Sequence, residues 1–298
     1  MRLRIIGNPI AGGGKARPRI EELTRLLQER GHAVDVMLTT KAGDALRWAG
    51  ELPGDLDRVI VAGGDGTLNE VLNGLTDVSR FPIVQMPVGT ANVLVRELKL
   101  PWKPAGVADN VEHGVVRKVD LGLIADMSEI HAPRRFLVVM SAGFDAMVIE
   151  DIHANRKGKL GFFGYIKPIW RTIRRYTPPV LSVRVDDGEP VSGAMVVVAN
   201  SKNYAGIFTV ADKAAMDSGF FDVCVLPKGK VLSLVGYALK AFRGGLSKVA
   251  SVSYQRGRRV TIESATPVPV EVDGEYFGTT PVSVTIQPSC VPIVVPES

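Results

Sequence analysis

A glycine-rich turn between two apolar segments constrains the fold of this chain more than any other feature. Residues 59–62 form a β-branched apolar run typical of a buried strand, and Val71 and Leu72 begin an apolar pattern at helical spacing. Between them lies Gly63–Glu70, which reads GGDGTLNE. Glycines let the backbone approach a ligand closely, and the amides at the start of a helix attract anions. The pattern predicts a strand, an anion-binding turn and a helix, with Thr67 and Glu70 forming a capping box.

The same order of elements recurs along the first part of the chain. The sequence predicts strands at 3–6, 32–38, 58–62 and 81–86, and helices from residue 18 and at 42–52. Repeated strand–helix units predict a parallel sheet that binds ligands at the carboxyl ends of its strands. Glycine turns also occur at 7–15 and 87–92, so we expect three turns to line one crevice. The first is no P-loop, because Pro9 and Ala16 replace a required glycine and a required hydroxyl residue.

After about residue 120 short strand-like runs dominate, such as 136–140 and 268–272, separated by turns such as Asp187-Gly188. Two helical segments interrupt them, at 160–176 and 230–242. This texture predicts an antiparallel β-sandwich. We therefore expect an α/β nucleotide-binding domain at 1–122 and a β-sandwich domain at 123–298, whose last segment either stays there or returns to the first domain.

Bulk properties narrow the class of protein. The 298 residues are 46% hydrophobic and carry a net charge of +5, which suits nucleotides, nucleic acids or anionic membranes. Cys224 and Cys290 form no CxxC pattern, so no disulfide framework or zinc site follows, and a reducing, cytoplasmic location is expected. No apolar run reaches the roughly 18–20 residues of a membrane span, so any membrane contact is expected to be peripheral.

Acidic residues in the turns point to phosphoryl transfer. A carboxylate at Asp65 would repel a bare phosphate within the amide cradle, which predicts a Mg²⁺ ion between them. Asp120 ends the first domain, and Asp273 and Glu275 flank Gly274. On their own, an Asp-Gly pair is typical of a hairpin turn and residues such as Thr90 are typical of helix caps.

Taken together, the motifs resemble the diacylglycerol kinase catalytic family, which includes sphingosine kinases and bacterial soluble lipid kinases. The resemblance covers nearly the whole chain in order. Its motifs are Asn8-Pro9, Gly12–Gly14, Thr39, Gly43–Ala45, Gly63–Glu70, Pro87–Asn92, Asp120–Gly122, Ser141–Asp145 and Val272–Glu275. GGDGT is shared with NAD kinases, whereas the PVGTAN turn and the late DGE narrow the resemblance to lipid kinases.

The resemblance implies an active site between the two domains, with ATP and Mg²⁺. Its implied ATP-binding residues are Asn8, Gly12, Gly13, Thr39, Gly63, Gly64, Asp65, Gly66, Thr67, Leu68, Asn69 and Thr90. Asp65 and Asp120 would organise Mg²⁺, largely through water. Glu275 would be the general base for the lipid hydroxyl, with Asp273 beside it. Relatives bind a structural metal through an Asp before a glycine; Ser218 stands there, so Asp217 substitutes or the site is absent.

The segment 152–185 holds eight basic residues and no acid. The basic residues are Arg156, Lys157, Lys159, Lys167, Arg171, Arg174, Arg175 and Arg184, interleaved with Leu160, Phe162, Phe163, Tyr165, Ile166, Ile169 and Trp170. A basic helix with aromatics suits an anionic bilayer. It equally suits a core-packed helix with a solvated basic face.

The leading interpretation is a kinase that phosphorylates a lipid hydroxyl and contacts the membrane peripherally. Diacylglycerol, phosphatidylglycerol and sphingoid bases stay open as acceptors, as do the choice between ATP and GTP and a homodimer. NAD kinase is the enzyme alternative, and a catalytically silent lipid- or nucleotide-binding protein is the non-enzyme alternative. Nucleic-acid binding is not expected, because it leaves the acidic residues unexplained.

Overall fold

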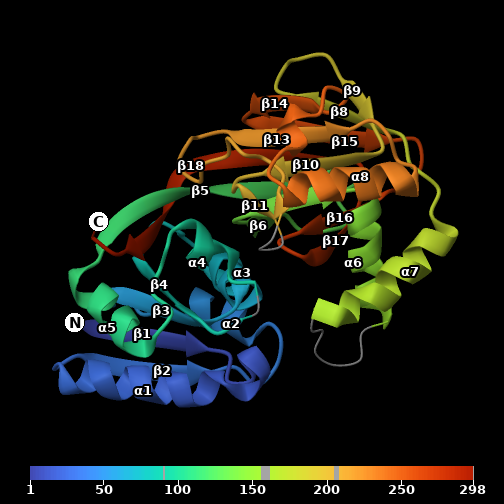
Figure 1. Cartoon of the computed structure of the whole chain (residues 1–298). Helices are drawn as coiled ribbons and strands as arrows, with labels where there is room; N and C mark the ends of the chain where they lie inside the picture. The colour runs from blue at the N-terminus through green and yellow to red at the C-terminus, as the bar shows by residue number, and fades with distance from the viewer. Residues whose placement is uncertain (90, 156–161, 205–207, 298) are drawn as a thin grey trace. The chain divides into compact units, whose positions relative to one another are not determined.

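The computed structural model describes residues 1–89, 91–155, 162–204 and 208–297, and of residues 162 and 163 only the backbone. The chain divides into two compact units. Unit 1 comprises Met1–Val119 and Ser289–Ser298, and unit 2 comprises Asp120–Pro288 (Figure 1). The division falls at residue 119, whereas the sequence analysis drew it at 122. The last ten residues group with unit 1.

Unit 1 is built on a parallel sheet in the order β2-β1-β3-β4. The strands are β1 (Arg2–Gly7), β2 (Ala33–Leu38), β3 (Arg58–Gly63) and β4 (Ile83–Pro87). The end of β18 (Val282–Val295) returns to this sheet, where Ile293 pairs with Ile83 in parallel. The predicted parallel α/β sheet is confirmed.

Helices cover the faces of this sheet. They are α1 (Ala16–Glu29), α2 (Asp44–Gly50), α3 (Asp65–Gly74), α4 (Val93–Glu97) and α5 (Pro104–His113), with a short 3-10 turn at Ala11–Gly14. Helix α1 packs against α5, and α2 packs against α3. Strands β3 and β4 are buried along almost their whole length, because a parallel sheet covered by helices has no solvent face.

Unit 2 is a β-sandwich. One antiparallel sheet has the order β14-β13-β10-β7-β16-β17. Its strands are β7 (Val139–Ala142), β10 (Met195–Ala199), β13 (Phe221–Leu226), β14 (Ser253–Gly257), β16 (Pro269–Val272) and β17 (Glu275–Thr279). In the other sheet β9 (Val191–Gly193), β8 (Leu181–Val185), β15 (Arg259–Ser264) and β18 follow in order, and β5 (Val115–Asp126) pairs with β18 and with β6 (Arg134–Phe136).

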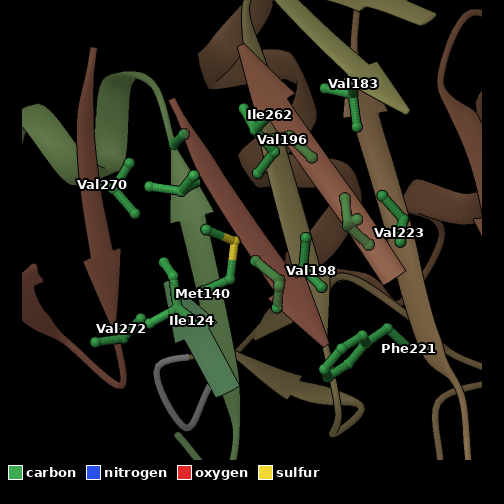
Figure 2. Close-up of a cluster of buried hydrophobic side chains, with 14 of the residues drawn as sticks. Ile124, Met140, Val183, Val196, Val198, Phe221, Val223, Ile262, Val270 and Val272 are labelled. Carbon is green, nitrogen blue, oxygen red and sulfur yellow. The ribbon is translucent and has the colours of Figure 1, made fainter. Parts of the chain in front are cut away.

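The core of the sandwich consists of alternating apolar side chains from the strands of both sheets. Figure 2 shows Val196, Val198 and Val223 of the first sheet together with Val183 and Ile262 of the second. The rings of Phe136 and Phe221 stack with centroids 5.7 Å apart. Core residues such as Val196 and Val198 alternate along the strands, but β7, β10, β13 and β16 are buried along almost their whole length, so the other face of this sheet is covered as well.

Helices and short elements complete unit 2. They are α6 (Phe144–Asn155), a 3-10 turn (Phe162–Tyr165), α7 (Ile166–Arg175), β11 (Asn203–Tyr204), β12 (Phe208–Thr209), α8 (Val231–Phe242) and a 3-10 turn (Leu246–Lys248). The prediction of one strand at 136–140 is wrong. Strand β6 ends at Phe136 and β7 begins at Val139 in the other sheet.

Candidate functional site

The glycine turns of unit 1 follow strands that are neighbours in the parallel sheet, so they meet at one edge. Backbone hydrogen bonds tie them together. The amide of Asn8 donates to the carbonyl of Ala62 at 2.9 Å, and the amide of Val88 donates to Gly63 at 3.1 Å. Thr39, after β2, joins the same edge by donating its amide to Gly7 at 2.8 Å. The sequence-predicted nucleotide residues of this unit therefore cluster, while Thr90 lies outside the described residues.

Direct backbone packing explains two of the glycines. A Cβ on Gly89 would lie 2.5 Å from the Cα of Gly64, so the second and third turns touch through their main chains. Gly12 has a φ of 57°, and a Cβ there would lie 2.3 Å from the carbonyl oxygen of Val88. These positions exclude any side chain, whether or not a ligand is present. Gly13, with a φ of 74°, has open space around its Cβ position, which suits the approach of a ligand.

Asp65 is the first residue of α3, and its carboxylate bridges two turns. Its Oδ1 accepts the amide hydrogen of Val93, the first residue of α4, at 2.9 Å. The preceding turn is closed by Asn92, whose φ is 44° and whose side chain exchanges two hydrogen bonds with the backbone of Gly89. Asp65 therefore sits where the positive end of α3 begins, at the edge formed by the turns.

The predicted capping box at the start of α3 is wrong. The helix begins at Asp65 after Gly64, and no side chain caps it. Thr67 is already inside the first turn, and Glu70 instead accepts the amide hydrogen of Gly43 at 3.2 Å. The side chains of Leu68 and Asn69 are also buried, at 2% and 4% exposure, so they pack inside the unit.

Sequence reasoning left the role of Asp44 open. This buried carboxylate accepts the amide hydrogens of Thr40 and Lys41 at 2.8 and 3.0 Å and the Thr40 hydroxyl at 2.8 Å. The hydrogen bonds from Thr40, led by its amide, lower the pKa of Asp44. The ionised carboxylate of Asp44 therefore shapes the loop that carries Thr39. An Asp at the start of a helix often accepts hydrogen bonds from nearby backbone amides in this way, so its position in the sequence could have indicated the role.

In unit 2, Asp120 and the turn at 216–219 lie together. Oδ2 of Asp120 accepts the amide hydrogen of Gly219 at 2.7 Å, and its own amide donates to Met216. Asp120 is fully buried. The hydroxyl of Ser218 donates to the carbonyl of Phe220 at 3.0 Å. Within the part of the chain that the structure describes, no three His, Cys, Asp or Glu residues are grouped to hold a metal, and Asp217 belongs to no such group.

The turn that carries Glu275 is held by the carboxylate of Asp273. Asp273 adopts a φ of 47°, and its two oxygens accept the amide hydrogens of Leu137, Val138 and Val139 at 2.8–3.0 Å. These bonds fix the bend between β6 and β7, which is the physical reason why one predicted strand is two. Asp273 thus has a structural task, whereas the Glu275 carboxylate is half exposed and pairs with Arg134.

Two acids behind this turn, the buried Glu271 and the partly buried Asp145, were missed as functional residues. Glu271 accepts the Ser141 hydroxyl at 2.9 Å and the Gly274 amide at 2.8 Å. Asp145 accepts the Tyr204 hydroxyl at 2.5 Å. Burial, with the charge of Asp145, raises the pKa of Glu271 to about 8, and burial also raises the pKa of Asp145. Glu271 alternates with Val270 and Val272 of the sandwich core, so it faces away from that core, and the sequence pattern gave no signal that this outward position is buried.

Two arginines of the basic segment 152–185 form ion pairs with a buried aspartate, whereas other basic residues of the segment are exposed. Asp151 on α6 is 1% exposed and accepts hydrogen bonds from Arg171 at 2.9 Å and from Arg175 at 2.8 Å on α7. These two arginines hold α7 against α6. Lys167 and Arg174 are exposed, as is Trp170 at 62%. Arg171 and Arg175 fit the packing interpretation, and contact with a membrane stays a prediction. Arg156, Lys157, Lys159 and Leu160 lie outside the described residues, as do the side chains of Phe162 and Phe163.

The chain combines a parallel α/β sheet, whose glycine turns meet at one edge, with an antiparallel β-sandwich. Two family models match this division. Residues 2–124 match the diacylglycerol kinase catalytic domain, and residues 138–295 match the YegS C-terminal NAD kinase beta sandwich-like domain.

Curated relatives agree with these family models. Diacylglycerol kinase of Staphylococcus carnosus (strain TM300) is 30% identical over 285 residues, covering 94% of this chain and 90% of that protein. Diacylglycerol kinase of Bacillus subtilis (strain 168) is 28% identical over 285 residues, covering 94% and 91%. The chain belongs to the diacylglycerol kinase catalytic family, and it is a kinase. The family resemblance inferred from the motifs is confirmed.

Solved structures confirm the fold. A diacylglycerol kinase from Bacillus anthracis str. Sterne matches with a TM-score of 0.74 at 20% identity, covering 99% of this chain and 96% of that chain. Yeast NADH kinase complexed with NADH matches with a TM-score of 0.54 at 10% identity, covering 100% and 84%. At these identities the likeness concerns the fold alone. No helix in the described ranges is long and apolar enough to cross a membrane.

Proposed function

We propose that this kinase transfers the γ-phosphate of ATP to the hydroxyl group of a membrane lipid, with diacylglycerol as the first acceptor to test. The observation that carries the proposal is the edge of unit 1 where Gly64 touches Gly89 and Asp65 accepts the Val93 amide. This edge lies at the N-terminus of α3 and includes Gly13, which has open space around its Cβ position. Backbone amides at such a place suit the binding of a row of phosphates. The names of the curated relatives support diacylglycerol as acceptor.

The residues of unit 1 fit a magnesium ion at Asp65. Carboxylate oxygens are preferred Mg²⁺ ligands, and the ion usually keeps several waters. Bound there, Mg²⁺ would neutralise charge on the transferred phosphoryl group. Asp120 fits less well, because it is fully buried and one of its oxygens accepts the Gly219 amide. We assign Asp65 as the principal carboxylate and Asp120 as a residue that shapes the turn at 216–219.

Glu275 is the proposed general base. Its carboxylate is half exposed and lies on a turn held by Asp273 and Glu271, so the acid is accessible while its backbone is restrained. Arg134 pairs with this carboxylate and holds its position, and a carboxylate can accept the proton of an acceptor hydroxyl.

Helix α7 supports peripheral contact with an anionic bilayer. Ile166 and Trp170 are each 62% exposed, and Lys167 and Arg174 are exposed beside them. Apolar and aromatic side chains enter the headgroup region, and each nearby basic residue adds about 1 kcal/mol. Because the acceptor is a bilayer component, this contact would deliver the enzyme to its substrate.

The test is a phosphotransfer assay with purified protein, labelled ATP, Mg²⁺ and vesicles that contain one acceptor each. The panel comprises diacylglycerol, phosphatidylglycerol, a sphingoid base and, in solution, NAD. We expect label in diacylglycerol, and loss of that label in Asp65→Asn. Label in another lipid would redirect the acceptor assignment. Label in NAD alone would overturn the proposal in favour of an NAD kinase, and no transfer to any acceptor would favour a silent binding protein.

A further inference from the structure

Helix α8 has two apolar faces. One packs inside unit 2, and the other is largely exposed, with the ring of Phe242 at its end lying edge-on to that of Phe208 at a centroid distance of 6.5 Å. Leu234, Tyr237 and Ala241 are buried. On the opposite side four large apolar residues recur at spacings of three, four and three, which places them in one stripe. They are Leu232 at 84% exposure, Val235 at 49%, Leu239 at 53% and Phe242 at 65%. A helix on the surface of a soluble domain normally carries charged and polar residues on that side.

Charge in the sequence that flanks α8 has a single sign. Residues 223–262 contain eight basic residues and no acid. The basic residues nearest the helix are exposed, namely Lys228, Lys230, Lys240 and Arg243. In the described parts of the chain none of these four forms a salt bridge with an acid. An apolar stripe bordered by cations without acidic partners has the composition of a helix that lies in the plane of an anionic membrane.

We propose that α8 is a second bilayer-docking surface, distinct from α7, and that it inserts the stripe of Leu232, Val235, Leu239 and Phe242 into an anionic membrane. Lys228, Lys230, Lys240 and Arg243 then contact lipid phosphates. The helix of 12 residues is about 18 Å long, which suits an element lying flat at the headgroup boundary. The inference concerns membrane binding only and does not depend on the phosphoryl acceptor.

A second copy of the chain fits this surface less well. A symmetric dimer through α8 would bring the same patch of both copies together, cations against cations. A stable interface also buries about 800 Å² on each partner, more than one stripe on a three-turn helix supplies. An anionic bilayer instead supplies complementary charge and an apolar layer at the same place.

The test is sedimentation of the intact protein with vesicles of phosphatidylcholine alone or with a quarter of phosphatidylglycerol. The stripe variant is Leu232→Ser with Leu239→Ser, and the rim variant is Lys240→Gln with Arg243→Gln. The matched control is Ile130→Ser, which removes an apolar side chain of 77% exposure elsewhere in unit 2. We expect about tenfold weaker partition to the anionic vesicles for the stripe variant, a smaller loss for the rim variant, and no change for the control.

A second measurement keeps the inference testable if the stripe variant unfolds. Val235→Trp places a reporter within the stripe, and its fluorescence should shift to the blue with anionic vesicles. A wild-type protein that does not bind these vesicles, equal binding by a folded stripe variant, or an unshifted reporter would overturn the inference. A concentration-dependent dimer seen by light scattering and abolished in the stripe variant would also overturn it, in favour of a second copy.

Discussion

The glycine turns of unit 1 and the acidic turn of unit 2 hold their backbones in opposite ways. Gly64 and Gly89 approach because neither has a side chain, so the contact is main chain against main chain. Around Asp273 the backbone is held because a carboxylate accepts three amide hydrogens from a distant segment. One turn therefore depends on excluded volume, the other on satisfied hydrogen bonds. The two should respond differently to substitution and to pH.

The largest expected effect falls on chemistry at the acidic turn. Glu275→Gln removes the proposed base but keeps the side chain's shape, so turnover should fall about 10²–10⁴-fold with ATP affinity nearly unchanged. Turnover is measured by steady-state kinetics with the lipid acceptor that the wild-type enzyme phosphorylates. ATP affinity is measured by nucleotide titration. Arg134→Gln, which removes only the partner of Glu275, is the control and should cost less. Near-normal turnover in Glu275→Gln would show that Glu275 is not the general base.

The next effect is on the stability of the same turn. Asp273→Ala leaves the amides of Leu137, Val138 and Val139 without their acceptor, and each buried unpaired donor costs about 1–3 kcal/mol. We expect a loss of about 3–5 kcal/mol in the free energy of unfolding, measured by denaturant titration. Asp273→Asn keeps one acceptor oxygen and tolerates the positive φ, so it should lose less. Equal losses would show that the hydrogen bonds do not hold the turn.

Gly89→Ala probes the glycine contact of unit 1. Its Cβ would lie 2.5 Å from the Cα of Gly64, so the turns must separate. Overpacking of this kind costs about 1–3 kcal/mol, to be read as a lower denaturation midpoint. The control is Gly13→Asn, whose site is open and whose side chain accepts the left-handed backbone. That variant should fold normally and bind ATP more weakly; the reverse pattern in the two variants would contradict the packing explanation.

The stability of the acidic turn should also depend on pH, because Glu271 accepts the amide hydrogen of Gly274 in this turn and has a raised pKa. The pKa of Glu271 rises from 4.5 to about 8 on folding, so the folded chain binds an extra proton between these values. The contribution of Glu271 to stability is complete below pH 4.5 and is lost as pH rises through about 8. Its slope is at most about 1.4 kcal/mol per pH unit. Glu271→Gln should flatten the stability profile in this window, and an unchanged profile would show that Glu271 does not titrate there.

The smallest effect concerns the basic residues of α7. Arg171 and Arg175 are held by Asp151, whereas Lys167 and Arg174 face outward. Lys167→Glu with Arg174→Glu should weaken sedimentation with anionic vesicles by at least about 1 kcal/mol per residue, less so in high salt. Arg171→Gln should instead lower the unfolding midpoint, because Asp151 loses a partner. Equal vesicle binding by the double variant would assign α7 to packing alone.

Local sequence patterns predicted elements well where burial alone decides them. The four strands of the parallel sheet lie within two residues of the predicted positions. Strands β3 and β4 are buried on both faces and read as nearly uninterrupted apolar runs, whereas β1 and β2 have charged residues between their apolar ones. Helix α6 was not predicted. It buries Ala146, Val148 and Ile152 but also Asp151, and an inward-facing acid disturbs the apolar period that marks a helix.

The α/β-plus-sandwich fold, the kinase family and the clustering of the glycine turns after neighbouring strands could all be predicted from the sequence. These follow from local apolar runs, turn chemistry and motif order. The hydrogen-bond and ion-pair partners of the acidic residues could be seen only in the tertiary structure. Asp273 bonds to residues 134–136 positions away, Asp151 pairs with a helix 20 positions on, and Glu70 reaches Gly43 and leaves the start of α3 uncapped. A carboxylate takes its function from donors that come within hydrogen-bonding distance only when the chain folds, and their separation along the sequence carries no periodic signal.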